Sequence, residues 1–260
     1  MGSGPIIGQR LGFVNEGRYG SIMAWREYPV WLLAVDTSGK DASVALLRDA
    51  RLVVLVAPRA EEQHSVALFR SINRALAEAG IGLADLDLYA VANGPGAFTA
   101  LRVGLAVVKG LAEMHDKPVA PVSLLEAVCE SAEADGLLVP IVDAYRGQIF
   151  GALYEKANGE PVRRSQERVL ILEEFLSTLQ AERAQPEQCT LVSPQLPRWE
   201  ARLQGSRFAA SRRETISPVL ADAVARRAAA KFARGEAVDA LHLEANYVRR
   251  SDAELLWKAK

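Results

Sequence analysis

The sequence predicts an α/β fold built from two related units, and three features of the chain support this prediction. Short apolar segments alternate with segments of helical periodicity along most of its 260 residues. An apolar strand, the turn Gly94-Pro95-Gly96 and an apolar helix follow one another directly. A pattern near residue 35 also returns near residue 142. The length suits two modest domains.

The first unit, residues 30–135, is expected to open with a hairpin, because two apolar segments flank a polar turn at 38–41. Its further elements follow from apolar runs and from helical spacing. The expected strands are 31–36, 43–47, 51–57, 88–92 and 118–122, and the expected helices are 64–79, 97–113 and 123–134.

The second unit, residues 136–243, is expected to repeat this alternation of strands and helices. The expected strands are 137–142, 148–155 and 189–193, and the expected helices are 173–184 and 218–234. Residues 244–260 are expected to return to the first unit, with a closing strand at about 245–249.

The repeated pattern indicates a duplicated unit. Residues 35–46 align with residues 142–153: each has an apolar strand ending in Val-Asp, a polar turn with a glycine, and a second strand with Ala-Leu at the same offset. Two units that each open with such a hairpin form the actin/hexokinase/Hsp70-like (ASKHA) plan, in which nucleotide phosphates lie between the halves. Asp36 and Asp143 are the two aspartates of this pattern.

Composition narrows the function classes. The net charge of −1 argues against a chain that grips nucleic acid by itself. Cys129 and Cys189 lie far apart in the sequence, so we expect reduced thiols. No apolar run approaches the roughly 20 residues of a membrane span. We expect a cytoplasmic protein, with residues 1–29 as a disordered extension that lacks the apolar core of a secretory signal.

The helix at 97–113 is apolar or small on every side, and a helix of this kind must be covered on every side. One interpretation is an ordinary buried helix of an α/β core. The other is that this helix and the helix at 64–79 dock on another chain, with small residues allowing close approach. The docking residues expected on that interpretation are Phe69, Ile72, Leu76, Ala97, Ala100, Leu101, Gly104 and Val108.

Five segments carry a family resemblance. They are Asp36-Thr37-Ser38 with Ser43–Leu46, Glu62–Ser65, Gly94–Gly104, Pro121–Leu125 and Val142–Gly147. In this order they resemble the bacterial TsaB (YeaZ) family, from about Trp31 to Lys258. The resemblance implies a two-domain actin-like fold and a partner subunit for N6-threonylcarbamoyladenosine formation next to the anticodon of ANN-decoding tRNAs. It implies the catalytic paralogue TsaD and the ATPase TsaE as partners, a homodimer when alone, and tRNA contact only through the complex.

The resemblance also identifies what this chain lacks. In TsaD a His-x-x-x-His pair on a helix binds the metal, because residues four apart share a helix face. Leu124 and Val128 stand at those positions here, and Glu126 between them is expected to be a helix-surface or capping group. We therefore expect no metal site, no catalytic residue and no stoichiometric cofactor. ATP or ADP at a subunit boundary is left open.

The candidate nucleotide or anion contacts are Asp36, Thr37, Ser38, Gly94 and Gly96. In actin-like ATPases a strand-end aspartate holds a Mg²⁺-bound water and the adjoining turn binds phosphate. The alternative is that the aspartates cap their own turns. An ASKHA-fold ATPase or phosphoryl-transfer enzyme is accordingly the alternative function.

Arg102 is the one charged residue in the first half of the helix at 97–113. An unpaired guanidinium at a buried site is costly, so we expect it to have a partner. The structural alternative is a carboxylate or backbone carbonyls of the same chain. The functional alternative is a bound phosphate or a carboxylate of a partner subunit.

Overall fold

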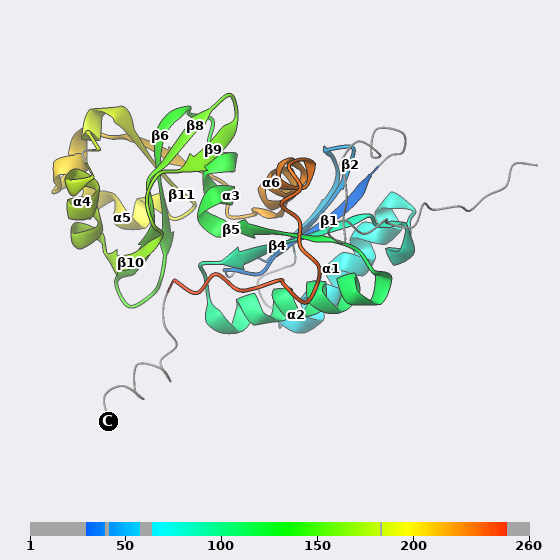
Figure 1. Cartoon of the computed structure of the whole chain (residues 1–260). Coiled ribbons are helices and arrows are strands. Elements are labelled where there is room, and N and C mark those ends of the chain that lie inside the picture. Colours follow the sequence, from blue (N-terminus) through cyan, green and yellow to red (C-terminus); the bar gives the residue numbers. More distant parts are fainter. Residues whose placement is uncertain (1–29, 40–41, 58–63, 183, 249–260) are drawn as a thin grey trace, which may run out of the picture.

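The computed structural model describes residues 30–39, 42–57, 64–182 and 184–248, and the expected extension at 1–29 lies outside them. Two mixed sheets lie beside each other, each with helices on its faces. Helices α3 (Leu124–Ser131) and α6 (Ala221–Ala233) lie between the two sheets (Figure 1).

The first sheet has the strand order β3-β2-β1-β4-β5. Its strands are β1 (Trp31–Asp36), β2 (Ser43–Arg48), β3 (Arg51–Val56), β4 (Leu88–Gly94) and β5 (Val119–Ser123). β2 is antiparallel to β1 and β3, whereas β4 is parallel to β1 and β5. β1 and β4 are buried on both faces, which explains why each is an unbroken apolar run in the sequence. All five expected strands of this unit are present.

The second sheet follows the order β10-β7-β6-β11-β12. The five strands of this order, in a sheet of seven, are β6 (Gly136–Asp143), β7 (Gln148–Gly151), β10 (Arg168–Ile171), β11 (Cys189–Ser193) and β12 (Arg212–Thr215). β7 is antiparallel to β6 and β10, and β11 is parallel to β6 and β12. Order and direction therefore match the first sheet strand by strand. The predicted duplication is confirmed, and the fold is the two-domain α/β fold of the actin/hexokinase/Hsp70-like class.

The structure differs from the expected strands in three places. The strand expected at 148–155 is two strands, because β7 pairs with the second half of β6 and β8 (Tyr154–Ala157) pairs with the first half. β8 forms a hairpin with β9 (Glu160–Arg163). The sequence analysis did not predict β9, β10 or β12. Residues 245–248 of the closing strand expected at 245–249 form no strand, and residue 249 lies outside the described residues; Asn246 and Tyr247 are attached to the first unit by single hydrogen bonds.

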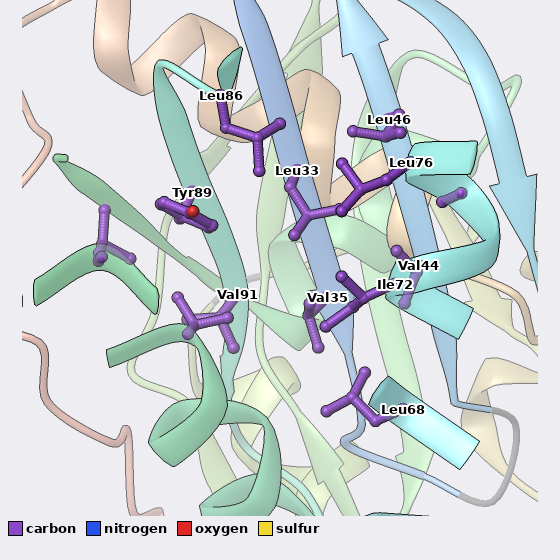
Figure 2. Close-up of a cluster of buried hydrophobic side chains, with 14 of the residues drawn as sticks. Leu33, Val35, Val44, Leu46, Leu68, Ile72, Leu76, Leu86, Tyr89 and Val91 are labelled. Carbon is purple, nitrogen blue, oxygen red and sulfur yellow. The ribbon is translucent and has the colours of Figure 1, made fainter. Parts of the chain in front are cut away.

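Two helices cover one face of the first sheet, α1 (His64–Ala79) and α2 (Phe98–His115). Figure 2 shows Leu68, Ile72 and Leu76 of α1 packed against the apolar side chains of β1 and β2. Tyr89 of β4 lies in the same core with its side chain fully buried, and burial raises the pKa of its hydroxyl to about 12. Of the apolar stripe that the sequence periodicity predicts for α1, Ile72 and Leu76 face this core, whereas Phe69 is exposed.

The opposite face of the first sheet is covered by α6, whose buried side is rich in alanine. Small side chains let the helix lie close to β1, β2 and β5. The boundary expected at residue 243 is thus too late, because the chain is back on the first unit from residue 221. The remaining helices, α4 (Leu172–Ala181) and α5 (Leu196–Gln204), pack on the second sheet. Within the described ranges, no helix has the length and hydropathy to cross a bilayer.

Candidate functional site

The structure brings the five candidate contact residues together at the carboxyl ends of β1 and β4. We call Asp36, Thr37, Ser38, Gly94 and Gly96 the turn cluster. Its three polar side chains are buried, with exposed fractions of 3%, 0% and 5% in chain order. The turn after β1 is tied to the turn after β4, because the Ala97 amide donates a 2.9 Å hydrogen bond to the carbonyl of Ser38.

The polar side chains of the turn cluster form hydrogen bonds with other groups of the same chain. The Asp36 carboxylate accepts hydrogen bonds from the Ser38 amide at 2.8 Å and the Ser38 hydroxyl at 2.6 Å. The Thr37 hydroxyl donates to the carbonyl of Ala100 on α2 at 2.7 Å. A phosphate approaching the Ser38 amide would have to replace the Asp36 carboxylate. Asp36 therefore caps its own turn, which is the second of the two alternatives given for this aspartate.

Three glycines allow segments of the same chain to approach one another. A Cβ at Gly96 would lie 2.6 Å from the Ser38 carbonyl oxygen, and one at Gly104 would lie 2.4 Å from the Thr37 hydroxyl oxygen. A Cβ at Gly94, which has a φ of +125°, would lie 2.5 Å from the carbonyl oxygen of Asn246. The expectation that Gly104 lets a partner helix approach is therefore wrong, since this glycine receives Thr37 of its own chain.

The equivalent turn in the second unit is built differently. Asp143 at the end of β6 forms an ion pair with Arg198 of α5 and accepts a 3.0 Å hydrogen bond from the Tyr145 amide. Tyr145, Arg146 and Gly147 all have positive φ, at 60°, 54° and 76°. Two consecutive non-glycine residues in this region carry backbone strain. The two turns share the strand-end aspartate and its hydrogen bond from the amide two residues further on, and they differ in the other partners of the carboxylate.

Most of the predicted docking residues lie in the core of the chain. Buried residues among them are Ile72, Leu76, Leu101, Gly104 and Val108. Ala97 and Ala100 are half-buried, and Phe69 is exposed by 52%. The prediction was wrong for the buried five because a continuous apolar stripe identifies the side of a helix that faces its own sheet. A docking surface must be sought on the opposite side of both helices.

That opposite side carries an apolar surface, which we call the outer face. It consists of Val66 and Phe69 on α1 and of Ala106, Gly110 and Met114 on α2, all exposed. Met114 is exposed by 75% and Val66 by 55%. Exposed apolar side chains gathered on neighbouring helices are typical of a protein–protein contact.

Arg102 is exposed rather than buried, and its partner is an aromatic side chain. Its Nε donates to the hydroxyl of Tyr247 at 3.1 Å, and its guanidinium lies 3.8 Å from the ring centre of Phe98. The rings of Phe98 and Tyr247 are 5.2 Å apart. The expected carboxylate or backbone partner was wrong, although the partner does belong to the same chain. Arg102 thus helps to hold residues near the C-terminus on the start of α2.

The positions of the histidine pair are filled by core side chains. Leu124 and Val128 are 3% and 0% exposed, and the described ranges contain no group of three or more His, Cys, Asp or Glu that could hold a metal ion. Glu126 does not act as a surface group. It pairs with Arg227 at 3.0 Å and with Lys231 at 2.9 Å, both on α6.

Comparison with known proteins identifies the family. A family model described as "TsaD: tRNA N6-adenosine threonylcarbamoyltransferase" matches residues 55–246. The chain belongs to the TsaD family. Its resemblance to the TsaB (YeaZ) branch is confirmed by the "tRNA threonylcarbamoyladenosine biosynthesis protein TsaB" of Bacillus subtilis, which is 36% identical over 129 residues. The tRNA N6-adenosine threonylcarbamoyltransferase of a Thermus thermophilus strain is also 36% identical, over 161 residues.

Solved structures agree with the TsaB-like assignment. YeaZ from Pseudomonas aeruginosa has a TM-score of 0.67 and 26% identity, covering 84% of this chain and 99% of that one. A crystal structure described as an uncharacterized protein similar to peptidase YEAZ, from the same organism, gives 0.71 and 28%, covering 85% and 100%. Among curated relatives, the matches span 49% of this chain and 56% of Bacillus TsaB, and 50% of this chain and 49% of the Thermus TsaD-family protein. The chain thus spans about half the length of the curated relatives it matches.

The sequence analysis did not predict the role of two buried charged side chains in this TsaB-like chain. Glu167, just before β10, is a buried carboxylate that contacts three separated segments. Arg227 of α6 is 3% exposed and bonds to Glu126 and, at 2.7 Å, to Glu160 of β9. Burial acts to lower the pKa of Arg227, and its hydrogen bond to Glu160 and the charge of Glu126 outweigh that effect, so the pKa is raised. The only sequence signal for Arg227 is a charge inside an alanine-rich helix face.

Proposed function

We propose that this TsaB-like chain is a non-catalytic partner subunit in tRNA N6-threonylcarbamoyladenosine biosynthesis. The names of its relatives support the pathway. Two observations support a subunit that contributes a surface rather than a reaction centre. The turn cluster is hydrogen-bonded within the chain, and Leu124 and Val128 are core side chains.

The observation that carries the proposal is the outer face of α1 and α2. Two helices of a like-folded TsaD-type paralogue pack on it, and Ala106 and Gly110 allow that contact to be close. A stable contact of this kind buries about 800 Å² on each partner. When the paralogue is absent, the same surface pairs with a second copy of this chain.

The other components act through this pair. The ATPase TsaE docks on the heterodimer, tRNA is bound by the complex rather than by this chain alone, and ATP or ADP binds at a subunit boundary if it binds this chain at all. Such a subunit works in the cytoplasm, where tRNA is modified, and it holds no stoichiometric metal or cofactor.

The test is a charge placed on the outer face. Phe69→Glu puts a carboxylate in the proposed contact, and Val162→Glu on β9 is the matched control because Val162 is exposed to the same degree, 50% against 52%. Binding to the TsaD-type paralogue of the same organism is measured by titration calorimetry. We expect a loss of at least about tenfold for Phe69→Glu, since burying an unpaired charge is unfavourable, and no change for Val162→Glu. Equal binding by both variants contradicts the proposed surface.

A second measurement separates the partner role from the alternative enzyme. The isolated chain is assayed for ATP hydrolysis and for threonylcarbamoyl transfer to an ANN-decoding tRNA, with and without the paralogue. We expect neither activity from the chain alone and transfer only with the other components present. Turnover of ATP by the isolated chain supports the ASKHA-fold ATPase instead.

A further inference from the structure

The C-terminal residues 238–248, which we call the strap, run along the first unit and reach the second. The strap (orange to red in Figure 1) follows α2 towards the second sheet. It begins with an antiparallel bridge in which Val238 and Val119 exchange two 2.8 Å backbone hydrogen bonds. Lys109 of α2 donates to the Leu241 carbonyl at 3.4 Å. The first part of the strap is therefore anchored to β5 and α2.

The strap meets the turn cluster at its far end. Asn93 forms two hydrogen bonds with the strap. The Asn93 side-chain amide donates to the Glu244 carbonyl at 3.1 Å, and the Asn93 backbone carbonyl accepts from the Asn246 amide at 2.8 Å. The absence of a side chain at Gly94 lets the Asn246 backbone lie against it. Asn246 is thus fixed to the first unit by its backbone.

The side chain of Asn246 points to the second unit. Its Nδ2 donates a 2.5 Å hydrogen bond to Oε2 of Glu167. The other carboxylate oxygen of Glu167, Oε1, accepts from the Ser123 hydroxyl and, at 2.9 Å, from the Tyr154 hydroxyl. Ser123 is the last residue of β5 in the first unit, and Tyr154 belongs to β8 in the second. One carboxylate therefore joins β5, β8 and the strap.

The surroundings of Glu167 make this junction specific. Its side chain is only 3% exposed, and the cation nearest to it is Arg163, 3.8 Å away and itself 55% exposed. A buried carboxylate needs its hydrogen-bond donors, because water cannot replace a lost one unless the site opens. Among the described contacts, Asn246 is the only group that donates a hydrogen bond to Oε2 of Glu167. Its loss thus leaves a buried charge unsatisfied on that side.

We propose that the strap is an interdomain latch, in which the Asn246–Glu167 hydrogen bond holds the two units in one relative orientation. The inference is independent of the proposed function, since it uses no residue of the outer face. It assigns the strap a conformational role: this bond ties the second unit to the turn cluster, in addition to the packing of α3 on the second sheet and the Arg227–Glu160 ion pair, which also join the two units.

The test exchanges donor and acceptor. Asn246→Asp places two carboxylates against each other and releases the latch. Adding Glu167→Gln restores it, because the new Oε1 keeps the bonds from Ser123 and Tyr154 while the new Nε2 donates to the aspartate. Glu167→Gln alone sets two amide groups at the junction and is the second single variant. If the two side chains bond directly, the two substitutions should compensate each other although each is disruptive alone; without a direct bond, no such compensation is expected.

Two readouts report on the latch. Hydrogen exchange measured on peptides covering 238–248 is expected to be at least about tenfold faster in Asn246→Asp and near the wild-type rate in the double variant. Spin labels on exposed cysteines introduced at Asn73 of α1 and Gln188 of the second unit report the distance between the units. We expect a broader distance distribution in the single variant than in the wild type and the double variant.

The outcomes decide the inference in either direction. Exchange and distance distribution unchanged in Asn246→Asp overturn it. A double variant that regains neither protection nor a narrow distribution overturns it too, whether or not the single variant folds. Recovery of both in the double variant supports the latch.

Discussion

Replacing Gly104 by alanine tests how the turn cluster is held on α2. The Cβ would lie 2.4 Å from the Thr37 hydroxyl oxygen and 3.4 Å from two Thr37 carbons. Thr37 is fully buried and donates to the Ala100 carbonyl on the same helix. The new methyl group therefore cannot be accommodated unless Thr37 moves and its hydrogen bond breaks.

The expected change in the free energy of unfolding has three parts. Breaking the buried Thr37–Ala100 hydrogen bond costs about 1–3 kcal/mol, and overpacking the contact costs about 1–3 kcal/mol more. Alanine regains about 1 kcal/mol over glycine inside a helix. Gly104→Ala is thus expected to destabilise the protein by about 1–5 kcal/mol.

Gly110→Ala is the matched control. It lies in the same helix, is exposed, and has no atom within 4 Å of the new Cβ, so only the helix propensity applies. It is expected to stabilise by about 1 kcal/mol. Urea unfolding of both variants gives the two free energies. If Gly104→Ala is as stable as Gly110→Ala, the close packing of Thr37 on α2 is refuted.

Three further measurements follow from the described contacts. Burial raises the pKa of the Cys129 thiol well above its ordinary value and that of Cys189 to about 11, so a thiol reagent at pH 8 should label neither in the native protein and both after unfolding. Arg227→Ala removes a buried cation from Glu126 and Glu160, which keep Lys231 and Arg234 as partners, and should lower stability in urea by about 1–3 kcal/mol, whereas an unchanged stability would show that the remaining cations compensate fully. The hydrogen bond from Arg202 lowers the pKa of Glu173, so its stabilisation exists above the unfolded-state pKa and disappears as the pH falls through the lower folded value. The melting temperature of Glu173→Gln should therefore fall less steeply than that of the wild type below about pH 4.5, and parallel curves would contradict this.

The sequence was most informative where local pattern and burial coincide. β1 and β4 are fully buried strands, so their apolar runs identify them without ambiguity. The repeated Val-Asp pattern predicted the duplication because each copy forms the same antiparallel hairpin. The close association of the Ser38 turn with Gly96 also follows from short apolar strands that end in turns at the same edge of the sheet.

The sequence was least informative where contacts join distant residues. An apolar stripe shows that a side of α2 is covered but not by what, so Leu101 and Val108 were assigned to a partner instead of the core. Glu167 is ordinary in sequence, and its burial arises only when residues 123 and 246 meet it. The partner of Arg102 lies 145 residues away, and no periodicity could have indicated it.

The two strand-end aspartates show how a duplicated fold can separate architecture from chemistry. In the first unit Asp36 receives the amide and hydroxyl of Ser38, and α2 closes over the turn through Thr37. In the second unit Asp143 pairs with a cation, Arg198. A carboxylate that holds a cation-bound water for phosphate chemistry has to present its oxygens to that water. Here both carboxylates have fixed partners within the chain, so the hairpin pattern serves the connection between strands, and the surface that we propose for function is the outer face of the helices.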